Sequence, residues 1–181
     1  MAETNIYNKM VLNKQLSIRP NEISSNINHN LEKCLRKEIE GICIKEGYVR
    51  PGSVNIISRS QGELDIVNFN GNTTFIVRYE VDICNPQIGQ IIECQIDDNN
   101  KSQADAFIDN VDTTPLQINL PRTHHLGNSE FVALKKGDII RMKVIAKGFK
   151  YKDKSITVIG HYVENLYVFL PYKYPILHYF H

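Results

Sequence analysis

The sequence lacks the features that mark membrane-spanning and secreted proteins. No apolar run approaches the roughly 18 residues that a transmembrane helix requires. The 4 cysteines include no Cys-x-x-Cys pair, and no signal peptide precedes them, so we expect reduced thiols in an intracellular protein. The formal net charge is only +1, which means that no overall field attracts the chain to nucleic acid or to an anionic membrane.

Patterns of enzyme active sites are also missing. The sequence contains no glycine-rich phosphate loop and no Ser/His/Asp constellation. Cys43 follows the end of a predicted helix, where the helix dipole disfavours a thiolate. We therefore expect Cys43 to pack as a small apolar residue, and we expect no catalytic residues and no cofactor.

The first half of the chain has the pattern of a small α+β unit. A strand is predicted over residues 10–19, with Pro20 at its end and Asn21 as the cap of a following helix. Apolar residues then recur at every fourth position, which predicts one amphipathic helix. This stripe consists of Ile23, Ile27, Leu31, Leu35 and Ile39. Over residues 42–84 the alternation changes to period two, and Asn70-Gly71 predicts a tight hairpin turn.

A second unit without helical periodicity follows Pro86. Short strands are predicted over residues 91–96, 106–111, 116–120, 138–146 and 155–163. Five strands over about eighty residues are typical of an OB-type Greek-key barrel. The expected fold is an α+β tip domain with one helix on a small antiparallel sheet, followed by an all-β OB-type barrel. The expected segments are a tip domain (1–84), a barrel (85–165) and an apolar aromatic tail (166–181).

Several short motifs occur in the order that one protein family shows. They are Glu40-Gly41-Ile42-Cys43 with Glu46-Gly47-Tyr48-Val49, Val77-Arg78-Tyr79 leading through Pro86 to Gly89-Gln90-Ile91-Ile92-Glu93, the run from Gly137-Asp138 to Ile145, and Ile159-Gly160. Over residues 10–165 the chain resembles the stalk subunits of multisubunit RNA polymerases. That family contains the seventh subunit of RNA polymerase II and its archaeal counterpart. The divergence of the sequence fits a homologue from a large DNA virus.

The resemblance implies a non-catalytic subunit of DNA-directed RNA polymerase. In the family, the tip domain docks on the core enzyme, and the subunit forms a heterodimer with a small helical partner of the fourth-subunit type. Core docking is then expected at two turns, Arg19-Pro20-Asn21 and Phe69-Asn70-Gly71-Asn72. The expected location is the nucleus for a eukaryotic cellular protein, and the cytoplasm or the virion for a viral one.

The barrel carries candidates for weak binding of nascent single-stranded RNA. Between Lys135 and Lys154 there are eight bases against two acids, and lysines attract phosphates while aromatic rings stack on bases. The candidates are Phe107, Arg122, His124, Lys143, Lys147, Lys150, Tyr151 and Lys152. The alternative is that alternating lysines form only the solvated face of a strand. Binding is expected to be weak because residues 97–105 are acidic and lack glycine.

No metal site is expected. His124 and His125 are adjacent, and adjacent side chains on a strand point to opposite sides, so they do not readily chelate one ion. Five acids could in principle gather Mg²⁺, but no nucleophile or base accompanies them, and a solubilising acidic face is the better interpretation. These acids are Asp97, Asp98, Asp105, Asp109 and Asp112.

Two other functions stay open at this point. One is a free-standing OB-fold RNA-binding protein of translation or RNA decay, and the other is an enzyme with Mg²⁺ on the acidic face. The predicted helical unit before the barrel favours the stalk subunit, because a free-standing barrel does not need it. The apolar tail (166–181) either packs on its own barrel or extends to a partner chain, and we favour the partner.

Overall fold

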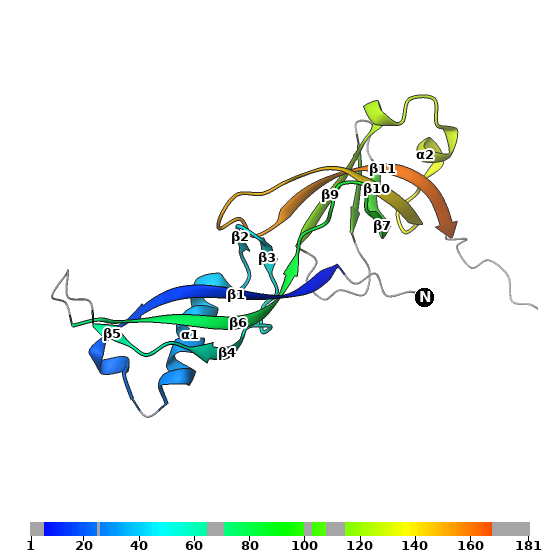
Figure 1. Cartoon of the computed structure of the whole chain (residues 1–181). Helices are drawn as coiled ribbons and strands as arrows, with labels where there is room; N and C mark the ends of the chain where they lie inside the picture. Colours follow the sequence, from blue (N-terminus) through cyan, green and yellow to red (C-terminus); the bar gives the residue numbers. More distant parts are fainter. Residues whose placement is uncertain (1–5, 25, 65–70, 100–102, 108–114, 168–181) are drawn as a thin grey trace, which may run out of the picture.

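The structure is a computed structural model that describes residues 6–24, 26–64, 71–99, 103–107 and 115–167. It contains a six-stranded sheet carrying one helix, followed by a closed five-stranded barrel. Figure 1 shows the two parts end to end in an elongated molecule, with the sheet and its helix at one end and the barrel at the other. The expected order of an α+β unit before an all-β barrel is therefore confirmed.

One long antiparallel pair organises the sheet. Strand β1 (Tyr7–Ile18) pairs with β6 (Thr73–Cys84) without a register shift, from Tyr7 opposite Cys84 to Ile18 opposite Thr73. Four short strands pair along the other side of β6 or extend the sheet from there. They are β2 (Cys43–Ile44), β3 (Gly47–Val49), β4 (Asn55–Arg59) and β5 (Glu63–Leu64). Among the described strands, nothing pairs with the outer edge of β1.

Helix α1 (Ile27–Ile39) covers one face of this sheet with the predicted apolar stripe, except for Ile23, which lies before the helix and is exposed. Leu31, Leu35 and Ile39 are fully buried against the sheet in one hydrophobic cluster. The predicted start of the helix is wrong, because Asn21 lies in a separate 3₁₀ turn, η1 (Pro20–Glu22), and α1 begins after Asn26. The Asn30 side chain binds the Glu22 carbonyl at 2.7 Å, which ties the turn to the helix.

The predicted tight turn at Asn70-Gly71 stays a prediction. The last described pair before it joins Leu64 of β5 to Thr73 of β6. Asn70 lies outside the described residues, whereas Gly71 has the positive φ, 71°, that glycine was expected to supply.

The barrel has the strand order expected for an OB-type Greek key. Strand β9 (Leu116–Pro121) runs parallel to β11 (Ile156–Tyr167), and the other neighbours are antiparallel in the closed order β10-β11-β9-β8-β7. The other strands are β7 (Ile91–Asn99), β8 (Gln103–Phe107) and β10 (Ile139–Gly148). The topology is compatible with the OB fold. Alternation placed most strands correctly, but β8 lies earlier than the predicted 106–111.

Two short helices between β9 and β10 were not predicted. Helix η2 (Arg122–His124) and helix α2 (Ser129–Ala133) are too short to produce a clear helical period in the sequence. The Asn128 side chain caps α2 by accepting the Phe131 N–H at 3.1 Å, and Phe131 is fully buried. Strand β11 also continues to Tyr167, so the predicted tail (166–181) overlaps the barrel, and residues beyond 167 lie outside the described part.

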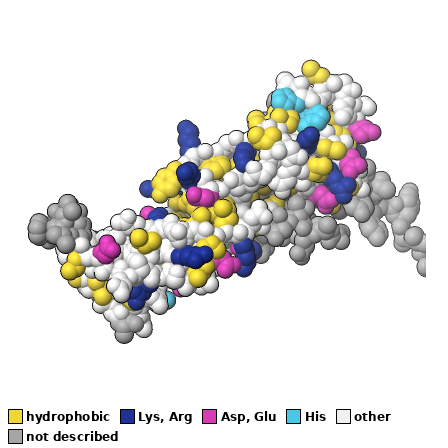
Figure 2. Space-filling view, in the orientation of Figure 1, with side chains coloured by type: hydrophobic (Ala, Val, Ile, Leu, Met, Phe, Trp, Pro, Cys, Tyr) yellow, Lys and Arg dark blue, Asp and Glu magenta, His cyan; other side chains and the backbone are white. Residues whose placement is uncertain are grey.

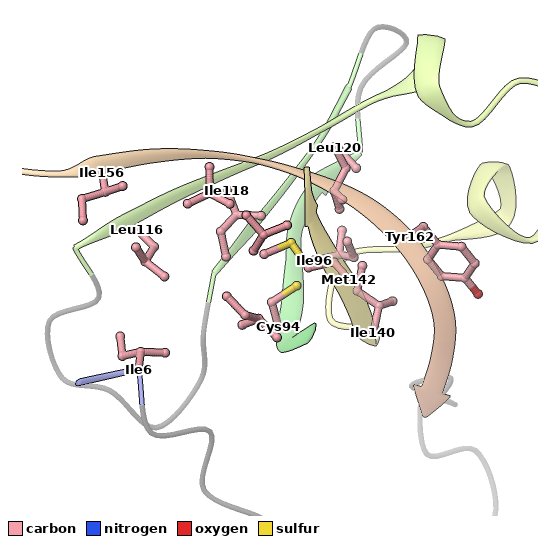
Figure 3. Close-up of a cluster of buried hydrophobic side chains, with 14 of the residues drawn as sticks. Ile6, Cys94, Ile96, Leu116, Ile118, Leu120, Ile140, Met142, Ile156 and Tyr162 are labelled. Carbon is pink, nitrogen blue, oxygen red and sulfur yellow. The ribbon is translucent and has the colours of Figure 1, made fainter. Parts of the chain in front are cut away.

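The barrel core extends into the sheet. Ile6, Tyr7, Cys43, Tyr48 and Cys84 belong to the same buried cluster as the barrel side chains. Figure 3 shows Ile6 at the edge of this core, on the side of Leu116 and Cys94. Because the core is continuous across the predicted division at residues 84 and 85, that boundary stays a prediction.

Backbone hydrogen bonds reinforce this junction. The Cys43 N–H donates to the Asp153 carbonyl at 2.7 Å, and the Lys152 N–H donates to the Cys43 carbonyl at 2.8 Å. The hairpin between β10 and β11 is thereby fixed to the edge of β2. Burial, with a smaller effect of Asp153, raises the pKa of Cys43 to about 11. Cys43 is therefore a buried, protonated thiol that packs at the junction, as the sequence predicted.

Gly47 at this junction provides a stability test. Its φ is 141°, and an added Cβ would lie 2.5 Å from the Cys84 carbonyl oxygen. Gly52 has a φ of 78° but nothing within 4 Å of such a Cβ. We expect Gly52→Ala to lower the free energy of unfolding by about 1–2 kcal/mol through backbone strain alone. Gly47→Ala should cost about 1–3 kcal/mol more, because the close approach adds overpacking. Urea unfolding followed by circular dichroism measures both, and equal losses would contradict the close approach.

Candidate nucleic-acid interface

The two turns predicted to dock on a core enzyme lie at the same end of the sheet. The pair Ile18–Thr73 places the chain after β1 beside the chain before β6. An added Cβ at Gly71 would lie 3.3 Å from the Pro20 ring. Arg19, Pro20, Asn21 and Gly71 are exposed, and Asn72 is half-buried. Phe69 and Asn70 lie outside the described residues, and the docking role stays a prediction.

Strand β10 presents its cations outward, but they do not form one free basic surface. Arg141 is held between two carboxylates, donating to Glu93 at 3.0 Å and to Glu164 at 2.8 Å. These bonds raise the pKa of Arg141, with Glu164 contributing most. Two positions further along, Lys143 is exposed and forms no ion pair with a described residue. Of these two cations, only Lys143 is therefore available to an anion.

Residues of the hairpin between β10 and β11 contact the junction of the sheet and the barrel, and they also lie at the surface. Lys147 is half-buried and donates to the Asn85 side chain at 2.5 Å. Lys152 has a φ of 72°, and its ammonium lies 5.6 Å from the centre of the exposed Tyr151 ring. Lys150 is exposed. RNA binding by Lys147, Lys150, Tyr151 and Lys152 stays a prediction, with Lys147 the least available of the four.

A groove on the outside of the barrel brings together two of the predicted residues, His124 and Lys143. Its volume is about 610 Å³. The lining consists of Ile88, Gly89, His124, Lys143, Val144, Ile145 and His161. None of these residues is acidic. In Figure 2 histidines lie at the surface of the barrel half, with hydrophobic and basic side chains around them. The groove therefore combines apolar walls with cationic and aromatic groups.

The walls of this groove are held together by backbone hydrogen bonds. The Gly89 N–H donates to the Val144 carbonyl at 2.8 Å, and the Val144 N–H donates to the Gln90 carbonyl at 2.9 Å. The turn before β7 is thereby attached to β10. Across the other side of β10, Lys143 pairs in register with His161 of β11. The relative positions of Ile88, Lys143 and His161 are thus set by the sheet.

A stack of rings supports His161 from inside the molecule. The buried His125 ring lies 4.0 Å from Phe131 and 4.7 Å from His161, with nearly parallel planes in both pairs. His125 Nδ1 lies 2.8 Å from the Pro121 carbonyl, and Nε2 accepts the Tyr162 N–H at 2.8 Å. These bonds select the neutral tautomer with its proton on Nδ1.

Sequence reasoning missed His161, and it treated the two adjacent histidines as strand residues. His124 is exposed and His125 is buried, but they lie at the end of a 3₁₀ helix and not in a strand. The alternation Gly160-His161-Tyr162 does indicate an outward His161. Its position opposite Lys143 depends on the β10–β11 register, which contains irregularities that sequence does not reveal.

The remaining predicted RNA-binding residues, Phe107 and Arg122, are not among the described residues that line the groove. Phe107 ends β8, but its side chain lies outside the described part, and Arg122 is half-buried in η2.

On the predicted acidic face of the barrel, the Asp97 carboxylate pairs with the Lys136 ammonium at 2.9 Å. The described residues contain no group of three side chains that could hold a metal ion. Asp109 and Asp112 lie outside them. No described helix is both long and apolar enough to cross a membrane.

Comparison with known proteins gives one informative similarity. The chain is 25% identical over 170 residues to a protein of Acanthamoeba polyphaga mimivirus described as "Putative DNA-directed RNA polymerase subunit L376". The alignment covers 88% of this chain and 83% of the viral protein. No protein-family model matches the sequence. The similarity supports an RNA polymerase subunit with a viral relative, and it does not distinguish the stalk subunit from other subunits.

His125 makes stability depend on pH. Burial lowers its pKa below the ordinary 6.5, outweighing the opposing bond to Pro121, and the neighbouring His161 and His124 lower it further. The unfolded chain therefore binds the proton more readily, so stability should be full above about pH 6.5 and fall as the pH drops below it. We expect the melting temperature to decrease between pH 7.5 and 5.5. In His125→Gln this decrease should be smaller, although the variant is less stable at pH 7.5. An unchanged pH dependence would show that His125 does not titrate on unfolding.

Proposed function

We propose that the protein is a non-catalytic stalk subunit of DNA-directed RNA polymerase, which docks on the core enzyme by its tip and contacts emerging RNA with its barrel. The observation that carries the proposal is the order of parts, a sheet with one helix followed by an OB-type barrel. The alignment with the viral protein extends over both parts of this chain. This alignment supports the assignment as a subunit of RNA polymerase. The resemblance of the sequence motifs to those of stalk subunits supports the stalk role.

The end of the sheet distant from the barrel is suited to docking. The exposed turn at Arg19-Pro20-Asn21 lies against Gly71, and Pro20 restricts the backbone there. The Arg19 N–H is 3.3 Å from a Glu22 carboxylate oxygen, which further holds the turn. A preformed turn loses little conformational entropy when it enters a pocket, so it favours stable assembly.

The small helical partner is proposed to bind beside the junction of the two parts. Strand β1 leaves its outer edge unpaired among the described strands and exposes Met10 and Val11 near its start. That start reaches the barrel through Ile6 and Tyr7. An unpaired edge with apolar side chains is a surface that a partner can cover.

The proposed location follows the polymerase. A viral source, which the mimivirus relative supports, would place the protein in the cytoplasm of the infected cell or in the virion. A cellular eukaryotic source would place it in the nucleus. The second candidate function is a free-standing OB-fold RNA-binding protein, which the groove with cationic and apolar lining favours.

Co-purification of tagged protein tests the stalk role. We expect the largest polymerase subunits and a small helical protein to accompany the tagged chain. The double variant Arg19→Glu/Asn21→Glu should lose the core subunits and keep the small partner, because it adds negative charge only at the far end of the sheet. The loss expected is tenfold or more, corresponding to at least about 1.4 kcal/mol.

The matched control is Lys33→Glu/Lys37→Gln on the exposed side of α1, which changes the net charge by the same amount. It should assemble like the unmodified protein. If both double variants retain the core subunits, docking occurs elsewhere. If the unmodified chain brings down RNA but no polymerase, the free-standing RNA-binding protein replaces the stalk subunit.

A further inference from the structure

We propose that the groove between Ile88 and His161 is a binding site for single-stranded RNA, in which a base stacks on His161 and Lys143 contacts the phosphate. The proposal deepens the RNA contact in the proposed function and rests on it for the source of the RNA. It adds His161, which was not among the predicted residues, and a geometry that depends on the β10–β11 register.

His161 can serve as a stacking platform because one of its faces is already supported. Its ring lies 4.7 Å from His125 at 14°, and His125 is stacked in turn on the buried Phe131. The hydrogen bonds from His125 to Pro121 and from Tyr162 to His125 hold this row in place. A base placed on the exposed ring of His161 would extend this row of stacked rings. Because the ring is already held in place, its side chain would lose little conformational entropy when a base stacks on it.

Lys143 provides charge next to this platform. It lies opposite His161 in the β10–β11 register, and its side chain passes within 4.0 Å of a Cβ position at Gly89. The neighbouring Arg141 is neutralised by Glu93 and Glu164, whereas Lys143 forms no ion pair with a described residue. A phosphate beside a base on His161 would therefore meet an ammonium group that no described carboxylate pairs with.

The remaining lining favours a nucleotide over an acidic peptide. Ile88 and Ile145 are 68% and 39% exposed, so they offer apolar walls for the flat faces of a base and a ribose. His124 adds a second ring to the lining, and none of the described lining residues is acidic. Stacking requires an unpaired base, because a duplex keeps its bases within its own stack. Single-stranded RNA is thus the occupant that uses the ring, the cation and the apolar walls together.

Fluorescence anisotropy of a labelled 15-nucleotide oligouridine with the full-length protein tests the site. We expect His161→Ala to weaken binding about tenfold and His161→Phe to restore most of it, because a base stacks on either ring. Lys143→Gln should weaken binding and reduce the slope of log affinity against log salt by about 0.7. The control is Lys136→Gln, which removes a lysine already paired with Asp97 and should leave binding nearly unchanged.

Melting temperatures close to that of the unmodified protein show that His161→Ala and Lys143→Gln still fold, and the rescue by phenylalanine provides a second check. Binding that is equal in the unmodified protein, His161→Ala and Lys143→Gln would overturn the site. Competition by a 15-residue oligoglutamate or by duplex RNA as effective as that by unlabelled oligouridine would overturn it as well.

Co-purification of the same variants with polymerase separates this inference from the proposed function. His161→Ala that loses RNA affinity and still assembles with the core supports both. If His161→Ala loses RNA affinity but even the unmodified protein does not assemble with polymerase, the result supports the groove and contradicts the stalk role. Assembly with polymerase without any effect of His161→Ala on RNA affinity supports the stalk role and contradicts the groove.

Discussion

The buried junction between the sheet and the barrel is the constraint on which the rest of the molecule depends. The barrel core continues through Cys84 and Tyr48 into the sheet, and the backbone of Cys43 pairs with the β10–β11 hairpin. Burial raises the pKa of Cys84 to about 12, so the thiols at this site remain neutral packing groups. The sheet and the barrel are therefore joined by one buried core and by backbone hydrogen bonds.

The barrel places its core and the proposed RNA-binding groove on opposite faces of the same strands. Along β10, Ile140, Met142 and Val144 fill the core, while the residues between them face outward. Gly160 of β11 permits close packing, because a Cβ there would lie 2.5 Å from the Met142 sulfur. The next residue, His161, faces outward into the groove. The proposed site thus draws on β10 and β11 of the barrel, together with the turn before β7 and helix η2.

Local periodicity predicted much of the fold. The stripe from Ile27 to Ile39 is the buried face of α1, and the alternation in β6, β10 and β11 located those strands to within a few residues. Element ends were less predictable. Asn21 has the chemistry of a helix cap but occupies a 3₁₀ turn, and α2 is stabilised by the burial of Phe131 and the cap at Asn128 rather than by a repeating pattern.

The candidate site was predictable only in part. The sequence identified Lys143 and His124 as candidates for RNA binding, but it could not show that Glu93 and Glu164 neutralise the neighbouring Arg141. His161 was missed because its support comes from His125, 36 positions earlier in the chain. The sequence by itself determined which faces are apolar, because side-chain alternation follows from backbone geometry. Only the tertiary structure decided which cations are free and which rings are stacked, because those depend on the strand register and on contacts between distant segments.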